Sequence, residues 1–304
     1  MIREPAELML KRLPLEGMTV GISGAVPERK FWGQVPDLDR LILTFVAQLS
    51  ALVIRYGGVV VHGSQPVLTP VVAEQARRQA REGTTPLKLF ASQLYGEIPD
   101  VTLRAARSVR AEVIVTSKIG NGDARDPETR NQSLTAMRLA MTQQADVVVA
   151  VGGKLHVDTG FNPGVLEELM QARWSGARCF VIGAFGGVAG QLERPVIEEL
   201  CAGNFLEVSE LTVMQMANWD EAMDEYVGKL LGHLARNAQE FRKPERFHYN
   251  PATFRPIHRS DTASLLSVEP GMVKAWSNRF ARLLHALETR DTSQACEILR
   301  SDSV

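Results

Sequence analysis

The 304-residue sequence lacks several features that would mark a protein class. Its only cysteines, Cys179, Cys201 and Cys296, include no CxxC pair, so neither a disulfide framework nor a zinc site is indicated, and we expect a reducing, cytoplasmic location. The 34 Lys plus Arg nearly balance the 35 Asp plus Glu, so no overall field favours nucleic acid or a membrane surface. A site for a polyanion must therefore be local.

Long apolar runs and common catalytic signatures are also missing. The most apolar stretch, at 145–152, is far too short for a bilayer span, and the first residues do not resemble a signal peptide, so we expect a soluble protein without a membrane partner. The sequence has no GxxxxGK[ST], no GxGxxG after the first predicted strand and no GxSxG. These absences disfavour a P-loop NTPase, a standard dinucleotide dehydrogenase and an esterase-type hydrolase.

Short apolar segments alternate with segments of helical periodicity. Residues 18–24 form an apolar run that ends in glycine, and residues 37–56 then repeat apolar positions at helical spacing. The alternation continues with predicted strands at 59–63, 87–94, 111–117, 145–151 and 178–183, and with predicted helices at 68–82, 127–144 and 165–174. Strands separated by helices predict βαβ crossovers, hence an α/β, Rossmann-like, doubly wound parallel sheet with helices on both faces.

The pattern changes after residue 240, which divides the chain into a Rossmann-like domain at 1–240 and a C-terminal extension at 241–304. Residues 241–259 carry three prolines, two histidines and aromatic residues among basic ones, without any secondary-structure period. We expect an extended arm that packs on another subunit; the alternative is a surface that stacks single-stranded bases. A helix is predicted at 272–288, and the polar residues after it are expected to fray.

Four glycine-rich turns are predicted at the carboxyl edge of the sheet, where ligands of parallel sheets bind. Glycines let the backbone approach a ligand, and the free amides of a helix's first turn attract phosphate. The candidate ligand-binding residues on these turns are Gly21, Ser23, Gly24, Gly63, Ser64, Gly152, Gly153, Pro163, Gly164, Gly186 and Gly187. Together they predict a site for a nucleotide-like small molecule.

Charged residues near these turns supply the remaining candidates. Lys154 and Arg138 suit phosphate, and Glu167 or Glu168 suits ribose hydroxyls or an oxocarbenium-like transition state. His62 is expected to be a packed strand-end histidine with a smaller chance of ligand contact. No metal site is expected, because the histidine and aspartate at 156 and 158 have no third partner in spacing, and no cofactor is required.

The order and spacing of residues 133–138 (SLTAMR), 145–154, 163–168 (PGVLEE) and 183–187 (GAFGG) resemble the SLOG superfamily, named for the Smf/DprA and LOG proteins. Within it the chain looks most like the clade found beside TIR and nucleoside-phosphorylase domains in bacterial conflict systems. The resemblance covers roughly residues 18–230. It implies a pocket that senses a nucleotide or an NAD- or ADP-ribose-derived signal, a role in antiphage defence, and a homo-oligomer, dimer or higher.

The LOG enzymes, which are phosphoribohydrolases, carry PGGxGTxxE on the corresponding loop and an arginine on the preceding helix. Gly164 and Glu168 match this motif, but Val165 replaces its threonine, and residues 154–162 lengthen the loop. If the chain is a LOG-like N-glycosidase, Glu168 and Arg138 are its expected catalytic residues. A DprA-like nucleic-acid binder is a further alternative, and the balanced charge makes nucleic acid an unlikely partner.

Overall fold

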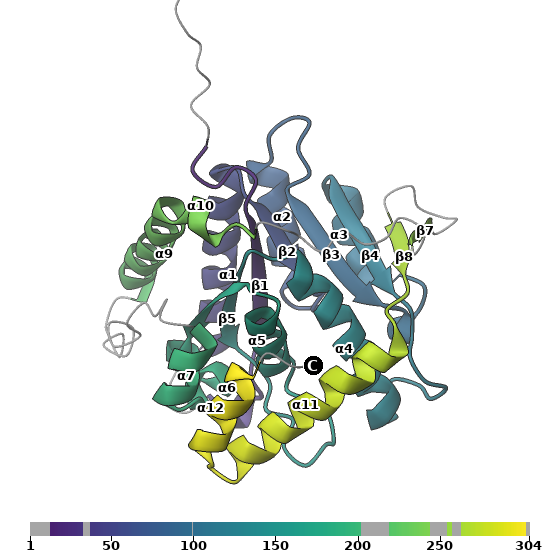
Figure 1. Ribbon diagram of the computed structural model, residues 1–304. Helices are drawn as coiled ribbons and strands as arrows, with labels where there is room; N and C mark the ends of the chain where they lie inside the picture. The colour runs from purple at the N-terminus through teal and green to yellow at the C-terminus, as the bar shows by residue number, and fades with distance from the viewer. Residues whose placement is uncertain are drawn as a thin grey trace, which may run out of the picture.

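The computed structural model describes residues 13–32, 37–98, 100–201, 219–243, 254–256 and 263–301. Its centre is an eight-stranded sheet in which seven strands are parallel and the last edge strand is antiparallel. From one edge to the other the order is β6 (Arg178–Ile182), β5 (Val147–Gly152), β1 (Thr19–Ala25), β2 (Val59–His62), β3 (Leu87–Ser92), β4 (Ala111–Thr116), β8 (Ala263–Leu266) and β7 (Phe254–Pro256). The predicted doubly wound α/β fold is confirmed (Figure 1).

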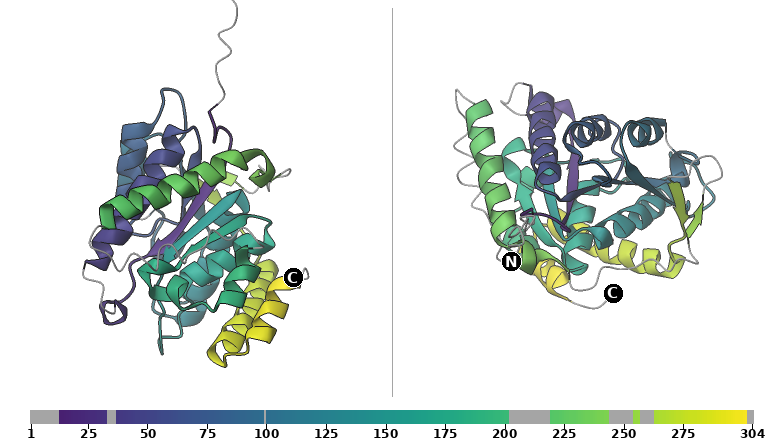
Figure 2. Two further views of the ribbon diagram at one scale, coloured as in Figure 1. Left: turned by 90° about the vertical axis from the view of Figure 1, so that its left-hand side faces the viewer. Right: turned by 90° about the horizontal axis from the view of Figure 1, so that it is seen from above.

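Helices cover both faces of the sheet, which is why the central strands are apolar along their whole length. In β5, Val147, Val149 and Val151 belong to one core, and Val148 and Ala150 belong to the other. The first core is covered by α1 (Leu38–Arg55), α2 (Thr69–Gln79), α3 (Asp100–Ser108) and α9 (Trp219–Arg236). The second is covered by α4 (Pro127–Gln144), α5 (Gly164–Trp174), α7 (Arg194–Cys201), α11 (Pro270–Glu288) and α12 (Thr292–Arg300) (Figure 2).

The strand order creates a crevice at the carboxyl edge. The chain steps from β1 through β2 and β3 to β4 on one side, and α4 then returns it to β5 on the other side of β1. The helices that follow β1 and β5 therefore leave toward opposite faces of the sheet. Such a switch point is where open α/β sheets bind ligands.

The C-terminal extension completes the sheet and its second layer. β8 pairs with β4 in parallel, and α11 packs along α4. The expectation that the final residues fray is wrong for 292–300, because α12 buries Ala295, Cys296, Ile298 and Leu299 against α7 and α11; residues 302–304 lie outside the described residues. Asp291 begins this helix by accepting a hydrogen bond from the Gln294 amide at 2.9 Å. The segment around 102–110, which had no clear period, is helix α3.

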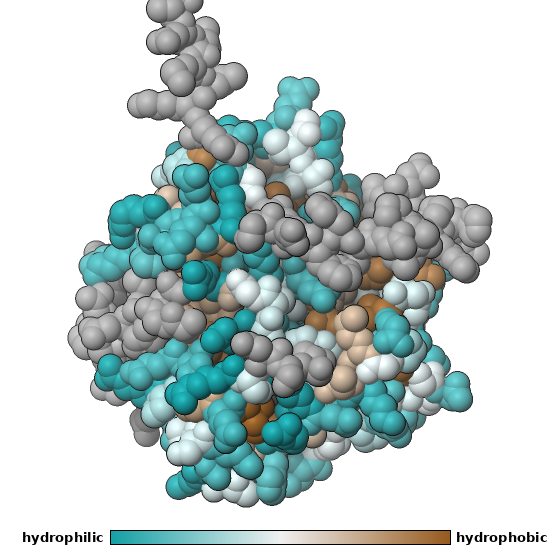
Figure 3. All heavy atoms as spheres, viewed as in Figure 1, coloured by the Kyte–Doolittle hydropathy of each residue, from teal (hydrophilic) through white to brown (hydrophobic). Residues whose placement is uncertain are grey.

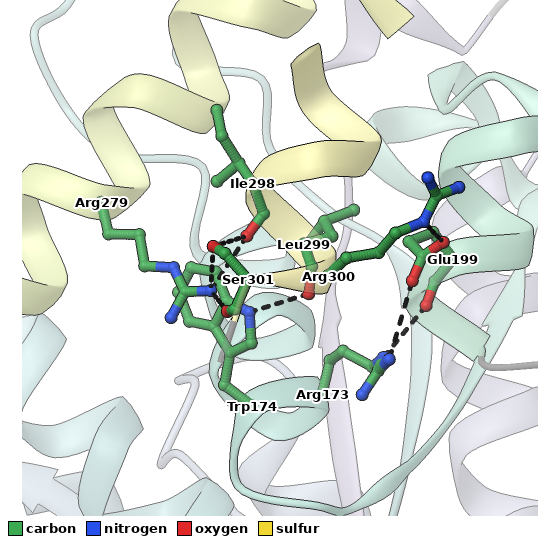
Figure 4. A network of polar contacts seen from close by, with 8 residues as sticks. All are labelled: Arg173, Trp174, Glu199, Arg279, Ile298, Leu299, Arg300 and Ser301. Carbon is green, nitrogen blue, oxygen red and sulfur yellow. Dashed lines mark hydrogen bonds and ion pairs between the residues drawn. The ribbon is translucent and has the colours of Figure 1, made fainter. Parts of the chain in front are cut away.

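Polar contacts fasten the end of α12 (Figure 4). The Arg279 guanidinium lies 3.3 Å from the centre of the Trp174 ring and donates to the Ile298 carbonyl at 2.9 Å. Trp174 Nε1 donates to the Leu299 carbonyl at 3.1 Å, and Arg300 Nε bonds Glu199 at 2.8 Å. A cation stacked on an aromatic ring at a helix C-terminus satisfies free carbonyls and complements the helix dipole.

Most of the predicted arm at 241–259 lies outside the described residues, so its packing, the homo-oligomer and any contact with nucleic acid stay predictions. Within it, Phe254–Pro256 form β7, and Lys243 lies at the amino edge of the sheet, where its amide donates to Asp146 Oδ1 at 3.0 Å. The face seen in Figure 3 is mostly hydrophilic, with apolar colour in small patches between helices. None of the described helices is long and apolar enough to span a membrane.

Candidate functional site

A cavity of about 470 Å³ opens at the switch point. Its walls come from the carboxyl ends of three neighbouring strands, from α4 and from the loop and helix that follow β5. The lining residues are Ile22, Gly24, Ala25, His62, Gly63, Ser64, Gln65, Pro66, Ala91, Ser92, Tyr95, Arg130, Leu134, Met137, Arg138, Lys154, His156, Gly164, Val165 and Glu168. We call it the switch-point pocket; its volume lies in the usual range for small-molecule sites.

An ion-pair cluster forms the floor of this pocket. Glu167 is fully buried, and its carboxylate accepts hydrogen bonds from the Thr135 hydroxyl and the Arg138 guanidinium. Arg138 Nε also lies 3.6 Å from Glu168 Oε1. The structure therefore brings both glutamates and the arginine together, but it gives them different positions: Glu167 is enclosed by protein, whereas Glu168 lines the pocket with 13% of its side chain exposed.

Burial raises the pKa of Glu168 above its ordinary value, because the surrounding protein disfavours the charged carboxylate. The nearby charge of Arg138 and the Ser23 hydroxyl oppose this shift, and Glu167 reinforces it. The Ser23 hydroxyl lies close to Glu168 without meeting hydrogen-bond geometry. Glu168 is thus a carboxyl group that holds its proton to higher pH than usual, at the floor of a pocket.

Positive charge gathers at the pocket mouth. Lys154 follows β5, and Arg130 comes from the first turn of α4, where its guanidinium stacks 3.9 Å from the centre of the Phe161 ring. Burial lowers the pKa of His156; Glu28 opposes this shift, and the fields of Arg130, Lys154 and Arg138 deepen it. Arg130 and Lys154 therefore make the mouth of the pocket suited to an anion.

Four buried polar atoms in or beside the pocket make no hydrogen bond to the described residues: Ser23 Oγ, His62 Nε2, Ser64 Oγ and Arg138 Nε, the last of which lies 3.6 Å from Glu168 Oε1. His62 is 1% exposed, and its Nδ1 must donate to the Ile22 carbonyl, 3.1 Å away, because a carbonyl only accepts. Burial lowers the pKa of His62, and hydrogen bonding to the backbone of Ile22 and Gln65 opposes this shift. Ser64 holds the left-handed backbone conformation, with φ of 54°. Unused polar atoms and backbone strain cluster at binding sites.

The predicted glycines divide into two groups. Gly24, Gly63 and Gly164 line the pocket. At Gly164 a Cβ would lie 2.5 Å from Arg138 Nη2, so glycine is what lets the guanidinium lie against the first turn of α5. Outside the lining, Gly21 packs on β5, Gly186 and Gly187 start α6 (Gly187–Gln191), and Pro163 lines a second cavity.

Gly152 and Gly153 let backbone segments next to the pocket approach one another closely. The Gly153 amide donates to the Ala25 carbonyl at 2.8 Å, which joins the ends of β5 and β1. A Cβ on Gly187 would lie 2.5 Å from the Gly153 carbonyl oxygen. Gly152, Gly153 and Gly187 thus allow the ends of β1 and β5 and the start of α6 to lie against one another.

We expect Gly187→Ala to lower the free energy of unfolding by about 2–3 kcal/mol, because it adds a backbone clash to the cost of a left-handed alanine. Gly176→Ala is the matched control: its φ is +77° against +63°, and nothing lies within 4 Å of its Cβ position. The control should lose only about 1 kcal/mol. Urea denaturation of both variants measures the difference, and equal losses would contradict the close approach.

The sequence-based prediction missed several pocket residues, among them Tyr95, Arg130 and Gln65. Tyr95 lies in the short helix η2 (Gln93–Tyr95) after β3 and is 48% exposed, which is unusual for a large aromatic side chain. Gln65 accepts from the amides of Val67 and Leu68, both at 2.7 Å, and so fixes the turn that enters α2. Their positions in the sequence could have indicated them. Gln65 and Tyr95 come just after predicted strands, and Arg130 lies in the first turn of a predicted helix at the carboxyl edge of the sheet.

Comparison with known families bears on this geometry. The family described as SLOG cluster2 matches residues 111–243, which include α4, β5, α5 and β6. This match, over 133 of the 304 residues, supports membership of the SLOG superfamily. It covers the part of the chain that supplies the pocket floor, with Arg138, Glu167 and Glu168, and the loop with Lys154. No curated protein matches the chain.

The described part of the chain contains no group of three or more His, Cys, Asp or Glu side chains that could hold a metal ion. Cys179, Cys201 and Cys296 are free and buried, and burial raises the pKa of Cys201 to about 12. Thiols in such surroundings behave as small hydrophobic side chains.

Proposed function

We propose that the switch-point pocket binds and senses a nucleotide-like ligand, of the NAD- or ADP-ribose-derived kind, in bacterial antiphage defence. The observation that carries the binding proposal is that Glu168 and two buried polar atoms without a hydrogen-bond partner, His62 Nε2 and Ser64 Oγ, line one pocket with a cationic mouth. A ligand with hydroxyl and phosphate groups would satisfy them. The defence role rests on the resemblance to conflict-system SLOG proteins alone.

The arrangement of charge fits a phosphorylated nucleoside in one orientation. Lys154 and Arg130 at the mouth would hold phosphate, and Arg130 is pre-oriented by its contact with Phe161. Glu168 and His62, deeper in the pocket, would accept hydrogen bonds from ribose hydroxyls. The exposed ring of Tyr95 at the rim offers a surface on which a base can stack.

A second candidate function is cleavage of an N-glycosidic bond, favoured by one observation. The raised pKa of Glu168 is a property of carboxyl groups that act as general acids in glycoside hydrolysis. The same glutamate also suits a binding site. Its carboxyl group is shielded from water in the pocket, so hydrogen bonds from the hydroxyl groups of a bound ligand would stabilise it. The two functions differ in turnover, because only an enzyme releases free base.

Lys154→Ala and Arg130→Ala are each expected to weaken the binding of ADP-ribose by about 1–2 kcal/mol, since each removes a charge-assisted hydrogen bond to phosphate. Isothermal titration calorimetry on the purified full-length chain, with ADP-ribose and adenosine monophosphate as probes, measures this loss. Lys274→Ala is the control, because Lys274 is exposed on α11 and does not line the pocket. Loss in the control alone, or in none of the three, would contradict phosphate binding at this mouth.

A further inference from the structure

A second cavity, of about 870 Å³, lies beside the switch-point pocket on the far side of the 154–162 loop. Its other walls are the segment that joins α6 to α7 and the turn between α11 and α12. We call it the loop groove. His156 lines both cavities, so a single loop separates them. The proposed ligand makes no use of this groove.

The floor of the loop groove is apolar and incompletely covered. Leu155, Leu192, Leu284 and Leu287 line it and are only half-buried, although they pack against the second core. Val157 also lines it and is 53% exposed, the highest exposure of any large hydrophobic residue in the described part of the chain. Apolar side chains converging on one groove mark a surface that gains from being covered.

The loop backbone holds Val157 outward in a conformation that costs energy. His156 and Asp158, on either side of it, are left-handed, with φ of 51° and 57°. For residues other than glycine this costs about 1 kcal/mol each. Asn131 of α4 fastens the end of the loop: it donates to the Gly160 carbonyl at 2.8 Å and accepts from the Asn162 amide at 3.0 Å. A left-handed backbone that exposes a valine is a feature that recurs at binding surfaces.

The rim of the groove is acidic. Asp158, Glu193 and Glu288 line it as exposed carboxylates, and Arg290 is the one cationic arginine or lysine among the lining residues. The acidic groups come from three separate elements, so they surround the apolar floor. A partner that fits this surface needs an apolar stripe bordered by positive charge.

We propose that the loop groove docks a basic amphipathic helix of a partner protein. Such a helix lays its apolar side chains, spaced at i, i+3, i+4 and i+7, into a hydrophobic groove. Its lysines and arginines then meet the three carboxylates at the rim, which favours the correct partner and speeds encounter. The proposal does not depend on what the switch-point pocket binds.

The test uses the full-length chain and a fluorescent peptide of about five helical turns, built from leucine and lysine with the leucines on one face. Fluorescence anisotropy should show saturable binding. Two peptides are compared: one with the same composition in scrambled order, and one with glutamate in place of lysine. Each should bind at least about tenfold more weakly, because one lacks the apolar face and the other is repelled by the rim.

Val157→Lys and Glu288→Lys should each weaken binding of the leucine–lysine peptide about tenfold, since they place positive charge on the floor and rim. Their matched controls are Val67→Lys, at a valine 48% exposed outside the groove, and Glu82→Lys, at an exposed glutamate. The controls should bind as the unaltered chain does. Equal affinity for the scrambled peptide, or equal losses in groove and control variants, would overturn the proposal; thermal unfolding confirms that all four variants fold.

Discussion

Replacing Arg138 with methionine is expected to lower the free energy of unfolding by about 3–5 kcal/mol, because the change leaves the carboxylate of Glu167 buried without its charge partner. Arg138 is 8% exposed and Glu167 is fully buried, so water cannot take the place of the guanidinium. Methionine keeps much of the side-chain volume, which limits the contribution of a cavity. Urea denaturation of the purified variant gives the loss directly.

The matched control is Arg78→Met, which breaks an ion pair with Glu74 at 2.6 Å on the exposed side of α2. Exposed pairs of this kind contribute little, so its loss should be much smaller. A double variant, Arg138→Met with Glu167→Gln, should recover part of the stability, since it removes the unpaired charge. If Arg138→Met and Arg78→Met are equally stable, the buried pair is not what holds the first turns of α5 to α4.

The fold was predictable because its signals are local. The apolar run that became β5 and the glycines after β1, β2 and β5 state the βαβ pattern within short windows. The C-terminal part was harder, because α12 has only nine residues and five of them are polar. What makes it a helix is packing against α7 and the Arg279–Ser301 contacts, and neither can be read from its own sequence.

The position of the candidate site could be predicted from the sequence, whereas the roles of its individual side chains could not. The glycine turns and the helix that begins at Gly164 place it at the carboxyl edge of the sheet. Which of the two adjacent glutamates faces the pocket depends on the rotation of α5 against α4, so sequence alone could not separate Glu167 from Glu168. The unused Nε2 of His62 likewise depends on a contact with the Ile22 carbonyl, forty residues away in sequence.

No free base is expected when adenosine monophosphate, a cytokinin ribotide or NAD is incubated with the protein and followed by chromatography. Glycoside hydrolysis commonly uses two carboxyl groups at the reacting centre. Among the residues that the structure describes, Glu168 is the only carboxylate that lines the switch-point pocket, because Arg138 and Thr135 hold Glu167 inside the protein. The loop at 154–162 is also longer than the corresponding loop of the LOG enzymes, and Val165 replaces the threonine of their motif, so the surroundings expected for the ribose differ from those in LOG enzymes.

Glu168→Ala then decides between a sensor and an enzyme. In a sensor it should weaken binding of ADP-ribose by about 3 kcal/mol, on the order of a hundredfold, since it removes an acceptor for two ribose hydroxyls, and it changes no turnover. In an enzyme the same change would lower kcat by about a hundredfold or more with little change in KM, because the glutamate would stabilise the transition state more than the bound substrate.

Because the pKa of Glu168 is raised, lowering the pH protonates this group before an ordinary glutamate, so sensor affinity should fall as the pH drops through that pKa. The Glu168→Gln variant should lose this part of the pH dependence. Steady base release that Glu168→Ala abolishes would replace the sensor with a glycosidase.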